Sequence, residues 1–462
     1  MKDVFGNIQS LEERGNKYKK LTNKILHMIC KDCQAIATVE RKGFKDLIKY
    51  AAPNYRMPSK KTFASYLDKK YDEISDIYKE RLKGVADITL TTDLWTDTLN
   101  TRIFLGITVH FLDGSKMATV ILGCYEFPKS HTSANITEKI QEACADRGIR
   151  KDQLSAIVTD NASNVVKAVK DFLEVEGHIG CAARKINLIA QNSIEGVTGL
   201  PGLIQKVRNI VTWCKHSNKA SYELKAGSLL KLEQGVKTRW NSTFYMIVRF
   251  IEIRDPARMV TPKEIEELIK VSKILKPLAK ITREWSAEKY VTISKVIPTI
   301  SGLREELSTM KIESNLANNL KTKMLDEIKL CFGLMEEVKH FAAATLLDPS
   351  FEKIDFKDLS RCARAIAIVK NSPEVSIWAR HHKLAERDQR RKLDITDELP
   401  PELSLFLRNL VISLKTDPIK WWVDNKSSYP LLTSIALRYI TIMATSIPSE
   451  RLFSKAGENM TA

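Results

Sequence analysis

The spacing of apolar residues changes along this chain, and the change limits the folds available to it. Between residues 85 and 126 apolar residues alternate with other residues at a period of two, which predicts β-strands. Over residues 10–82, and again from about 200 to 425, they recur every three or four residues, which predicts helices. The sequence therefore predicts a sheet-containing core between two helical regions.

Three strands are expected in succession within the period-two stretch. They are "ITLTTDLWTD" (88–97), "RIFLGITVHFL" (102–112) and "KMATVILGCYEF" (116–127), and the "DGS" that separates the last two is typical of a hairpin turn. This order predicts an antiparallel meander.

A crossover connection is expected after the meander. Residues 133–147, with Ser133 at the start and Gly148 after the end, are typical of a capped helix, and "LSAIVTD" (154–160) is typical of a strand. A strand–helix–strand connection is right-handed and places the two strands parallel in one sheet. A further helix after residue 160, and a short strand near 178 that leads into another helix, complete a mixed sheet of five strands.

Two acids lie at the expected ends of neighbouring strands. Asp93 follows "ITLTT" and Asp160 follows "LSAIVT", and reactive groups gather at the carboxyl ends of adjacent strands in open α/β sheets. Two nearby carboxylates repel each other unless one is protonated or a cation bridges them. The pair therefore suggests a Mg²⁺ or Mn²⁺ site for phosphoryl transfer. A turn acid at Asp93 and a helix N-cap at Asp160 are the alternatives.

The charge balance favours an acidic partner. The chain has 73 Lys and Arg against 56 Asp and Glu, a formal net charge of +17, and nucleic acid is the commonest acidic partner inside the cell. A well-solvated basic surface is the alternative. No apolar run approaches the roughly 20 residues that span a bilayer, so no membrane partner is expected. Eight scattered cysteines favour a reducing compartment over a disulfide framework.

Four motifs together resemble one protein family. "TTDLWTD" (91–97), "VTDNASN" (158–164), "KTRWNST" (237–243) and "YPLLTSIALRYITIMATSIPSERLFSKAG" (429–457) are similar to landmarks of the hAT superfamily of DNA transposases and of the BED-finger proteins derived from them. The resemblance implies an α/β ribonuclease H-like core interrupted by a large all-α insertion. It also implies DNA as a partner, self-association, a nuclear location and no small-molecule substrate.

The resemblance assigns catalytic residues and shows one departure. It implies that Asp93, Asp160 and Glu450, the acid of "SERLFS", form a DDE triad that binds Mg²⁺ or Mn²⁺. The fold must then return Glu450 to the strand ends. The family carries a C-x-x-H motif near its active site, whereas this chain reads "GCAARKINL", with Arg184 in the place of the histidine. Arginine retains phosphate affinity but neither transfers a proton nor ligates a metal.

Other motifs imply DNA contacts and self-association. The expected DNA contacts are Arg184, Arg239 and Trp240, with Trp240 as a stacking surface and a place in the core as its alternative. The segment "DPIKWWVDNKSSYPLL" lies in a region that the family uses for dimerisation. An apolar dimer surface is expected there from Trp421, Trp422, Tyr429 and Leu432. An intramolecular core cluster is the alternative.

Both ends of the chain bear on these expectations. Cys30 and Cys33 form a lone CxxC with no second ligand pair at zinc spacing, so no zinc site and no BED finger is expected, and their helical phase favours structural thiols. The chain ends at "KAGENMTA", within the resembled dimerisation region, so a shortened final helix is expected.

The expected organisation has four parts: an N-terminal helical region (1–82), the first part of the core (83–200), a helical insertion (201–396) and a C-terminal dimerisation region that carries the last acid (397–462). The leading interpretation is a nuclear, DNA-associated, self-associating transposase derivative that retains the triad after domestication or degradation. An active, metal-dependent DNA transposase and a non-catalytic interaction scaffold are the alternatives.

Overall fold

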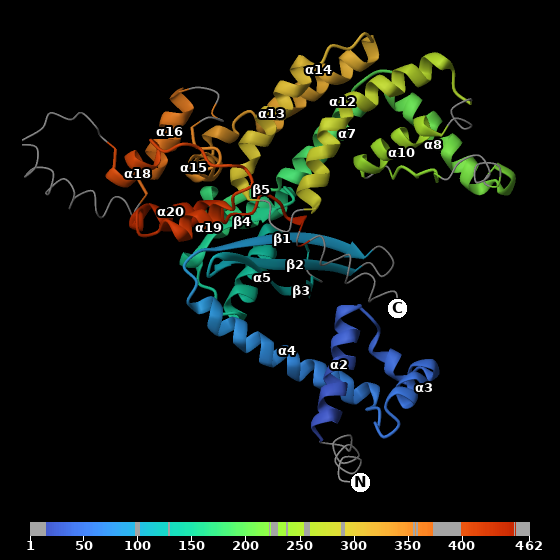
Figure 1. The fold of residues 1–462 in the computed structure, drawn as a ribbon, viewed down its shortest axis with the longest axis vertical. Helices are drawn as coiled ribbons and strands as arrows, with labels where there is room; N and C mark the ends of the chain where they lie inside the picture. The colour runs from blue at the N-terminus through green and yellow to red at the C-terminus, as the bar shows by residue number, and fades with distance from the viewer. Residues whose placement is uncertain are drawn as a thin grey trace, which may run out of the picture.

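A computed structural model describes most of the chain, namely residues 15–97, 102–127, 130–220, 222, 230–236, 239–253, 259–287, 292–353, 356, 359–372, 399–447 and 449. Figure 1 shows a group of N-terminal helices joined by one long helix to a central sheet, with a larger body of helices on the other side of that sheet. None of the described helices combines the length and apolar character needed to span a membrane.

A mixed sheet of five strands lies at the centre, in the order β3-β2-β1-β4-β5. The strands are β1 (Ile88–Asp97), β2 (Arg102–Asp113), β3 (Lys116–Glu126), β4 (Leu154–Thr159) and β5 (His178–Gly180). Strand β1 pairs antiparallel with β2 and parallel with β4, so it is the central strand of the sheet. The predicted meander, the parallel crossover and the short fifth strand are confirmed, and Gly114 takes a positive φ of 64° in the hairpin turn.

The two helices beside the sheet are close to the predicted ones. They are α5 (Ser133–Asp146) and α6 (Ser163–Leu173). The sequence predicts Ser133 as the cap of α5, but the cap is Thr132, whose hydroxyl accepts the Asn135 N–H at 3.3 Å. The two hydroxyl residues are adjacent, and Thr132 has the extended backbone that an N-cap needs, whereas Ser133 is already helical. Gly148 follows α5 with a positive φ of 67°, as its predicted role as a helix terminator requires.

The two faces of the sheet differ in chemistry. Ile88 and Leu90 of β1 and the residues opposite them on β2 belong to an apolar cluster with α5 and α6. Because side chains alternate along a strand, Thr89, Thr91 and Asp93 point to the other face. Apolar burial therefore attaches α5 and α6 to one face and leaves a polar stripe on the other.

The chain after β5 forms a body of helices, and the core of this body includes residues of β4 and β5. One cluster of buried side chains extends from β4 and β5 through these helices to residue 444. The predicted helical character from about 200 to 425 is confirmed for the described residues. The helices are α7 (Ala182–Glu195), α8 (Leu200–His216), α10 (Trp240–Glu252), α12 (Pro262–Ala287), α13 (Val296–Thr309), α14 (Asn315–Phe332), α15 (Lys339–Leu347), α16 (Leu359–Lys370), α18 (Pro401–Phe406), α19 (Pro418–Asp424) and α20 (Pro430–Ile440). Most of the predicted linker, residues 380–403, lies outside the described residues.

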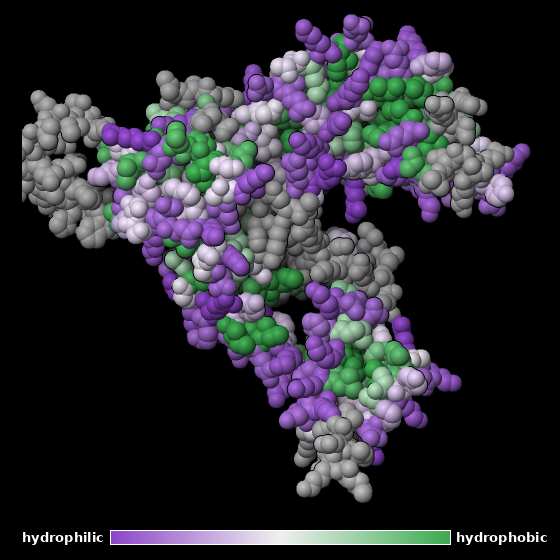
Figure 2. Space-filling view, in the orientation of Figure 1, coloured by the Kyte–Doolittle hydropathy of each residue, from purple (hydrophilic) through white to green (hydrophobic). Residues whose placement is uncertain are grey.

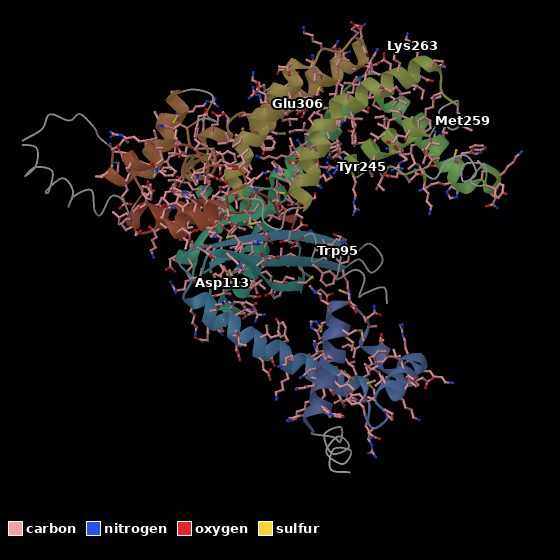
Figure 3. All side chains as sticks on the ribbon, in the orientation of Figure 1. Trp95, Asp113, Tyr245, Met259, Lys263 and Glu306 are labelled. Atoms are coloured by element: carbon pink, nitrogen blue, oxygen red, sulfur yellow. The ribbon has the colours of Figure 1, made fainter. Side chains whose placement is uncertain are left out.

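The N-terminal helices form a small unit with its own core. They are α2 (Asn16–Lys31), α3 (Lys42–Ala51) and α4 (Lys60–Lys83). Buried residues of α2, of the start of α4 and of the segments between the helices make a cluster separate from the other two, whereas Leu82 near the end of α4 belongs to the cluster under the sheet. Helix α4 is capped by Ser59, whose hydroxyl accepts the Thr62 N–H at 3.2 Å, and it runs to the sheet (Figure 1). There Arg81 forms an ion pair with Asp113 at the end of β2 (Figure 3). Helix α4 therefore joins the N-terminal unit to the core.

Aromatic side chains of the C-terminal region pack inside the molecule. Trp422 is fully buried, its ring lies 4.9 Å from that of Phe406, and its Nε1 donates to the Leu347 carbonyl at 2.7 Å. Tyr429 and Leu432 are 4% and 2% exposed, and Trp421 is half-buried. This corrects the expectation of an exposed apolar surface, because the chain's own helices cover these side chains. The intramolecular cluster, the alternative from the sequence, is what the structure contains.

Replacing Trp422 by alanine is expected to lower the free energy of unfolding by about 3–5 kcal/mol, because it removes a fully buried ring and leaves a cavity. Urea unfolding followed by circular dichroism measures the change. Trp213→Ala is the control, since Trp213 is 53% exposed and its removal should change the free energy by about 0.5 kcal/mol or less. Equal effects of the two substitutions would contradict the core role of Trp422.

Candidate active site

Asp93 lies inside β1 rather than at its end. The strand continues to Asp97, but its pairing with β4 stops at Thr91, so Asp93 is just beyond the parallel ladder. Its side chain is 9% exposed, and Oδ1 accepts the Leu94 N–H at 3.0 Å. Opposite it on β2 is Gly106, which has no side chain to fill the space beside the carboxylate. In Figure 3 Trp95, two residues on, marks this end of the sheet and Asp113 marks the other.

Asp160 directly follows β4, as predicted. Its Oδ1 accepts the Ala162 N–H at 3.0 Å, which closes a tight turn before α6. Thr89 pairs with Ala156 and Thr91 with Val158, a constant offset of 67 in residue number. The same offset continued by two residues brings Asp93 level with Asp160. Neighbouring strands lie about 4.8 Å apart, so both acids lie at the same end of the sheet, where the pairing of β1 with β4 stops. This end is called the acidic edge below.

The turn after Asp160 depends on a close approach to β5. Asn161 has a positive φ of 73°, a conformation that asparagine tolerates better than most residues. Its side-chain oxygen occupies the space where a Cβ would stand on Gly180. Thr159 Oγ1 is 2.9 Å from His178 Nε2 and accepts the Asn161 N–H at 3.3 Å. Gly180 and His178 therefore help to shape the turn that carries Asp160.

A segment from the C-terminal region returns to this edge. The Ala182 N–H donates to the Ala444 carbonyl at 2.9 Å, and the Ser446 N–H donates to Cys181 Sγ at 3.3 Å. Ser449 Oγ lies 2.9 Å from Thr91 Oγ1, a contact between residues 358 positions apart. Glu450, the third predicted acid, lies outside the described residues.

The acids offer the donor chemistry that a hard divalent cation needs. Asp93 and Asp160 carry carboxylate oxygens, the ligands that Mg²⁺ and Mn²⁺ prefer. Within the described ranges no three His, Cys, Asp or Glu side chains come together in a group suited to a metal ion. Two of the three predicted ligands, Asp93 and Asp160, lie in these ranges, and the metal site stays a prediction.

Positive side chains lie next to the acidic edge. Arg184 is exposed in the first turn of α7, close behind the buried Cys181 that accepts from Ser446. Burial, followed by the nearby Lys170 and Lys185, lowers the pKa of His178 to about 4, so its imidazole is neutral at physiological pH. Arg184 therefore supplies exposed positive charge in the first turn of α7, and its contact with phosphate stays a prediction.

The two residues of the "RW" motif have different environments. Arg239 is exposed, whereas Trp240 is 3% exposed and packs 6.4 Å from Phe244 between ring centroids. The Trp240 ring is therefore part of the core, which was the alternative from the sequence. This corrects the expectation of an open stacking surface, because neighbouring helices cover the ring.

Family models match three stretches of the chain. Residues 91–182 match the ZBED1 RNase-like domain, residues 179–273 match the ZBED1 RNase-like helical domain, and residues 402–462 match the hAT family C-terminal dimerisation region. The first match covers Asp93 and Asp160, and the last covers Ser449.

Several relatives resemble most of the chain. Zinc finger BED domain-containing protein 4 of Homo sapiens is 25% identical over 96% of this chain, and zinc finger BED domain-containing protein 6 of Homo sapiens is 24% identical over 94%. The transposable element Hobo transposase of Drosophila melanogaster is 24% identical over 72%. The chain is a hAT-family, ZBED-like protein. It spans 42%, 52% and 54% of the length of these three relatives, in the order given.

Some residues around the candidate site were not predicted from the sequence. They are Thr91, His110, Cys181 and Ser449, which join the C-terminal segment to the sheet. One available signal was the polar alternation of Thr89, Thr91 and Asp93 in a strand that is otherwise buried. No sequence signal indicated that their partner would be Ser449.

Gly180→Ala in this hAT-family protein is expected to lower the free energy of unfolding by about 1–3 kcal/mol, because the new methyl group overlaps the Asn161 side chain. Urea unfolding measures the change. Gly202→Ala is the control, since a methyl group there meets nothing within 4 Å and lies in helix α8, where alanine is favoured over glycine. Equal stability of Gly180→Ala and the native chain would contradict the close approach of β5 to the Asp160 turn.

Proposed function

We propose that this chain is a DNA-associated, self-associating nuclear protein of the hAT family, in which Asp93, Asp160 and Glu450 form a divalent-metal site on a ribonuclease H-like core. The described helices between residues 200 and 372 would be the insertion into that core. The leading function is that of a transposase derivative with reduced activity. An active DNA transposase is the second candidate.

One observation carries the proposal. The C-terminal segment reaches the central strand through the Ser449–Thr91 contact, two residues before Asp93, while β4 beside it ends at Asp160. Three parts of the sequence that carry the family's acid motifs therefore converge on one sheet edge. Simple core packing needs no acid in any of the three, so the convergence supports a shared chemical role.

The acids suit the proposed chemistry. A divalent cation at such a site activates water and neutralises phosphate charge. Asp93 is nearly buried within a strand, so its carboxylate is held in place, and Gly106 leaves room beside it. Asp160 is fixed through its bond to the Ala162 N–H. Arg184 would bind a phosphate of the DNA strand.

The N-terminal unit supports an association with DNA. Residues 15–61 contain 12 Lys and Arg and 3 Asp and Glu, a difference of +9 out of the +17 of the whole chain. Lys20, Lys24 and Lys31 of α2 are exposed, and Figure 2 shows hydrophilic residues around a smaller hydrophobic patch on the visible face of the N-terminal helices. Phosphate contacts by exposed lysines supply sequence-independent affinity for DNA.

Self-association is supported by the C-terminal region. That region matches the hAT family dimerisation model, and within it Leu405, Leu410 and Leu414 are 51%, 91% and 74% exposed. These leucines, rather than the buried aromatic cluster, are available to a second copy. A purely structural scaffold is less well supported, because it gives no role to Asp93 and Asp160 on neighbouring strands.

The catalytic activity of the protein depends on the residue at position 184, which is arginine. Where the family motif has a histidine, an arginine cannot take or give a proton. His178 is not at the motif position, and its Nε2 lies 2.9 Å from Thr159 Oγ1. Reduced activity therefore has a chemical reason, and this favours the derivative over the active transposase.

The metal site is tested by calorimetry with Mn²⁺ on the full chain. Asp93→Asn combined with Asp160→Asn is expected to weaken Mn²⁺ binding at least tenfold, because it removes two of the three proposed carboxylate ligands. The control pairs Asp146→Asn with Asp171→Asn, which removes the same charge from exposed helix positions. Equal affinities in the two double variants would contradict the site.

The same variants separate the two candidate functions. Nicking of duplex DNA by the native chain that disappears in Asp93→Asn would favour the active transposase. Mn²⁺ binding without nicking, together with DNA binding, would favour the derivative.

DNA association is tested by the salt dependence of binding to a duplex. Replacing Lys20, Lys24 and Lys31 by glutamine is expected to weaken binding and to lower the slope of log K against log salt by about 0.9 for each phosphate that is no longer neutralised. Replacing Lys273, Lys276 and Lys280, exposed on α12, removes the same charge and should change the slope less. Equal slopes for the two triple variants would argue against a DNA surface on α2.

A further inference from the structure

A chain of hydrogen bonds, part-buried at Thr119 and buried from His110 onward, links strands β3, β2 and β1 and ends at the C-terminal segment. Thr119 Oγ1 of β3 lies 3.0 Å from His110 Nδ1 of β2, and His110 Nε2 lies 3.1 Å from Thr91 Oγ1 of β1. Thr91 Oγ1 in turn lies 2.9 Å from Ser449 Oγ. Three strands are thereby linked, side chain to side chain, to a segment that is far away in the sequence.

The members of this chain other than the exposed Thr119 are placed where polar groups are costly. His110 is 1% exposed and Thr91 is fully buried, and an unpaired polar group in such a position destabilises the fold. Burial lowers the pKa of His110 to about 3, so the ring is neutral and carries one N–H and one acceptor nitrogen. A neutral imidazole between two hydroxyl groups satisfies both of its nitrogens, because each hydroxyl both donates and accepts.

Apolar side chains such as valine or leucine would fill the space of Thr91 and His110 without needing hydrogen-bond partners. Packing alone therefore does not explain the chain of hydrogen bonds. Hydrogen bonds differ from apolar contacts in being directional. Thr91 is β-branched, which restricts its χ1 and aims its oxygen. A directional chain that ends on Ser449 therefore specifies where that residue sits on β1.

The position of Ser449 matters because of its neighbours. Thr91 lies two residues before Asp93 on the same face of β1, about 7 Å along the strand. Ser449 is bonded covalently to Glu450. We propose that Thr91 and His110 are positioning residues, which hold Ser449 against β1, two residues before Asp93, and so fix the residue that precedes Glu450 in the sequence. The role of Glu450 in this inference rests on the proposed function.

The same segment has a second attachment that does not depend on these hydrogen bonds. Ala444 and Ser446 bond to the β5–α7 junction through the Ala182 N–H and Cys181 Sγ. Those bonds hold the earlier part of the segment. The Thr91 contact holds its last described residue, and removing that contact should release this end while the rest stays attached.

The sheet contains a matched control for Thr91. Thr108 lies directly opposite Thr91 on β2 and is 1% exposed, and its hydroxyl has no hydrogen-bond partner within the described part of the protein. Thr108→Val makes the same chemical change at the same depth without touching the chain of hydrogen bonds. Ser449→Ala tests the contact from the other side, and it leaves the sheet intact if Thr91→Val fails to fold.

The experiment is hydrogen exchange on the full chain, read by mass spectrometry on the peptide that covers residues 441–449. Thr91→Val and Ser449→Ala are each expected to speed its exchange about tenfold, and the double variant should exchange no faster than the faster single variant. Peptides from β2 and α5 should be unchanged. His110→Phe, which keeps a ring of similar size, is expected to behave as Thr91→Val does, and Thr108→Val as the native chain does.

Unchanged exchange in Thr91→Val and Ser449→Ala, or equal effects of Thr91→Val and Thr108→Val, would overturn the inference. Mn²⁺ affinity, measured on the same variants, should fall in Thr91→Val and hold in Thr108→Val, which a purely stabilising role would not produce. A native chain that binds no Mn²⁺ would refute the proposed metal site. The exchange rates would still decide whether the hydrogen-bond chain holds the segment.

Discussion

The parallel pairing of β1 with β4 determines where chemistry can occur in this protein. It stops at Thr91 opposite Val158, so the ladder between the two strands ends at one level and Asp93 and Asp160 follow at the same edge. Where neighbouring parallel strands end, backbone and side-chain groups can face a ligand. Helices α5 and α6 cover one face through apolar contacts, and the polar face accepts the C-terminal segment.

The helical body is an integral part of this arrangement. Its buried side chains form one cluster with β4 and β5 and continue to the residues just before Ser449. The residues that lead from α15 and α20 to the sheet are therefore held by packing against the helical body, and they do not form a flexible tether. Ile293 donates its N–H to the Ile442 carbonyl at 3.0 Å, so the segment is attached to the helical body shortly before it reaches the sheet. This attachment helps to place Ser449, which is distant in sequence from β1, against Thr91.

Charge is distributed unevenly over the same framework. The small N-terminal unit carries much of the positive charge and is joined to the sheet by α4, whereas the acids lie at the sheet edge. A polyanion bound by the basic unit would be held by the same chain that carries the acids. The four residues that the sequence suggests as an apolar dimer surface serve a different purpose, because Phe406, Leu347 and their neighbours cover them.

Local sequence determined most of the secondary structure and two of the candidate acids. Period-two alternation identified the meander, and the position of Asp160 after an apolar run identified a strand end, because these signals arise from neighbouring residues alone. Tertiary structure decided the rest. Trp240 and Trp422 are buried because other helices cover them, and Asp93 lies just beyond the parallel ladder, inside β1 rather than at its end. Likewise, Thr91 meets Ser449 only because the helical body returns the chain to the sheet, a long-range contact that no local pattern encodes.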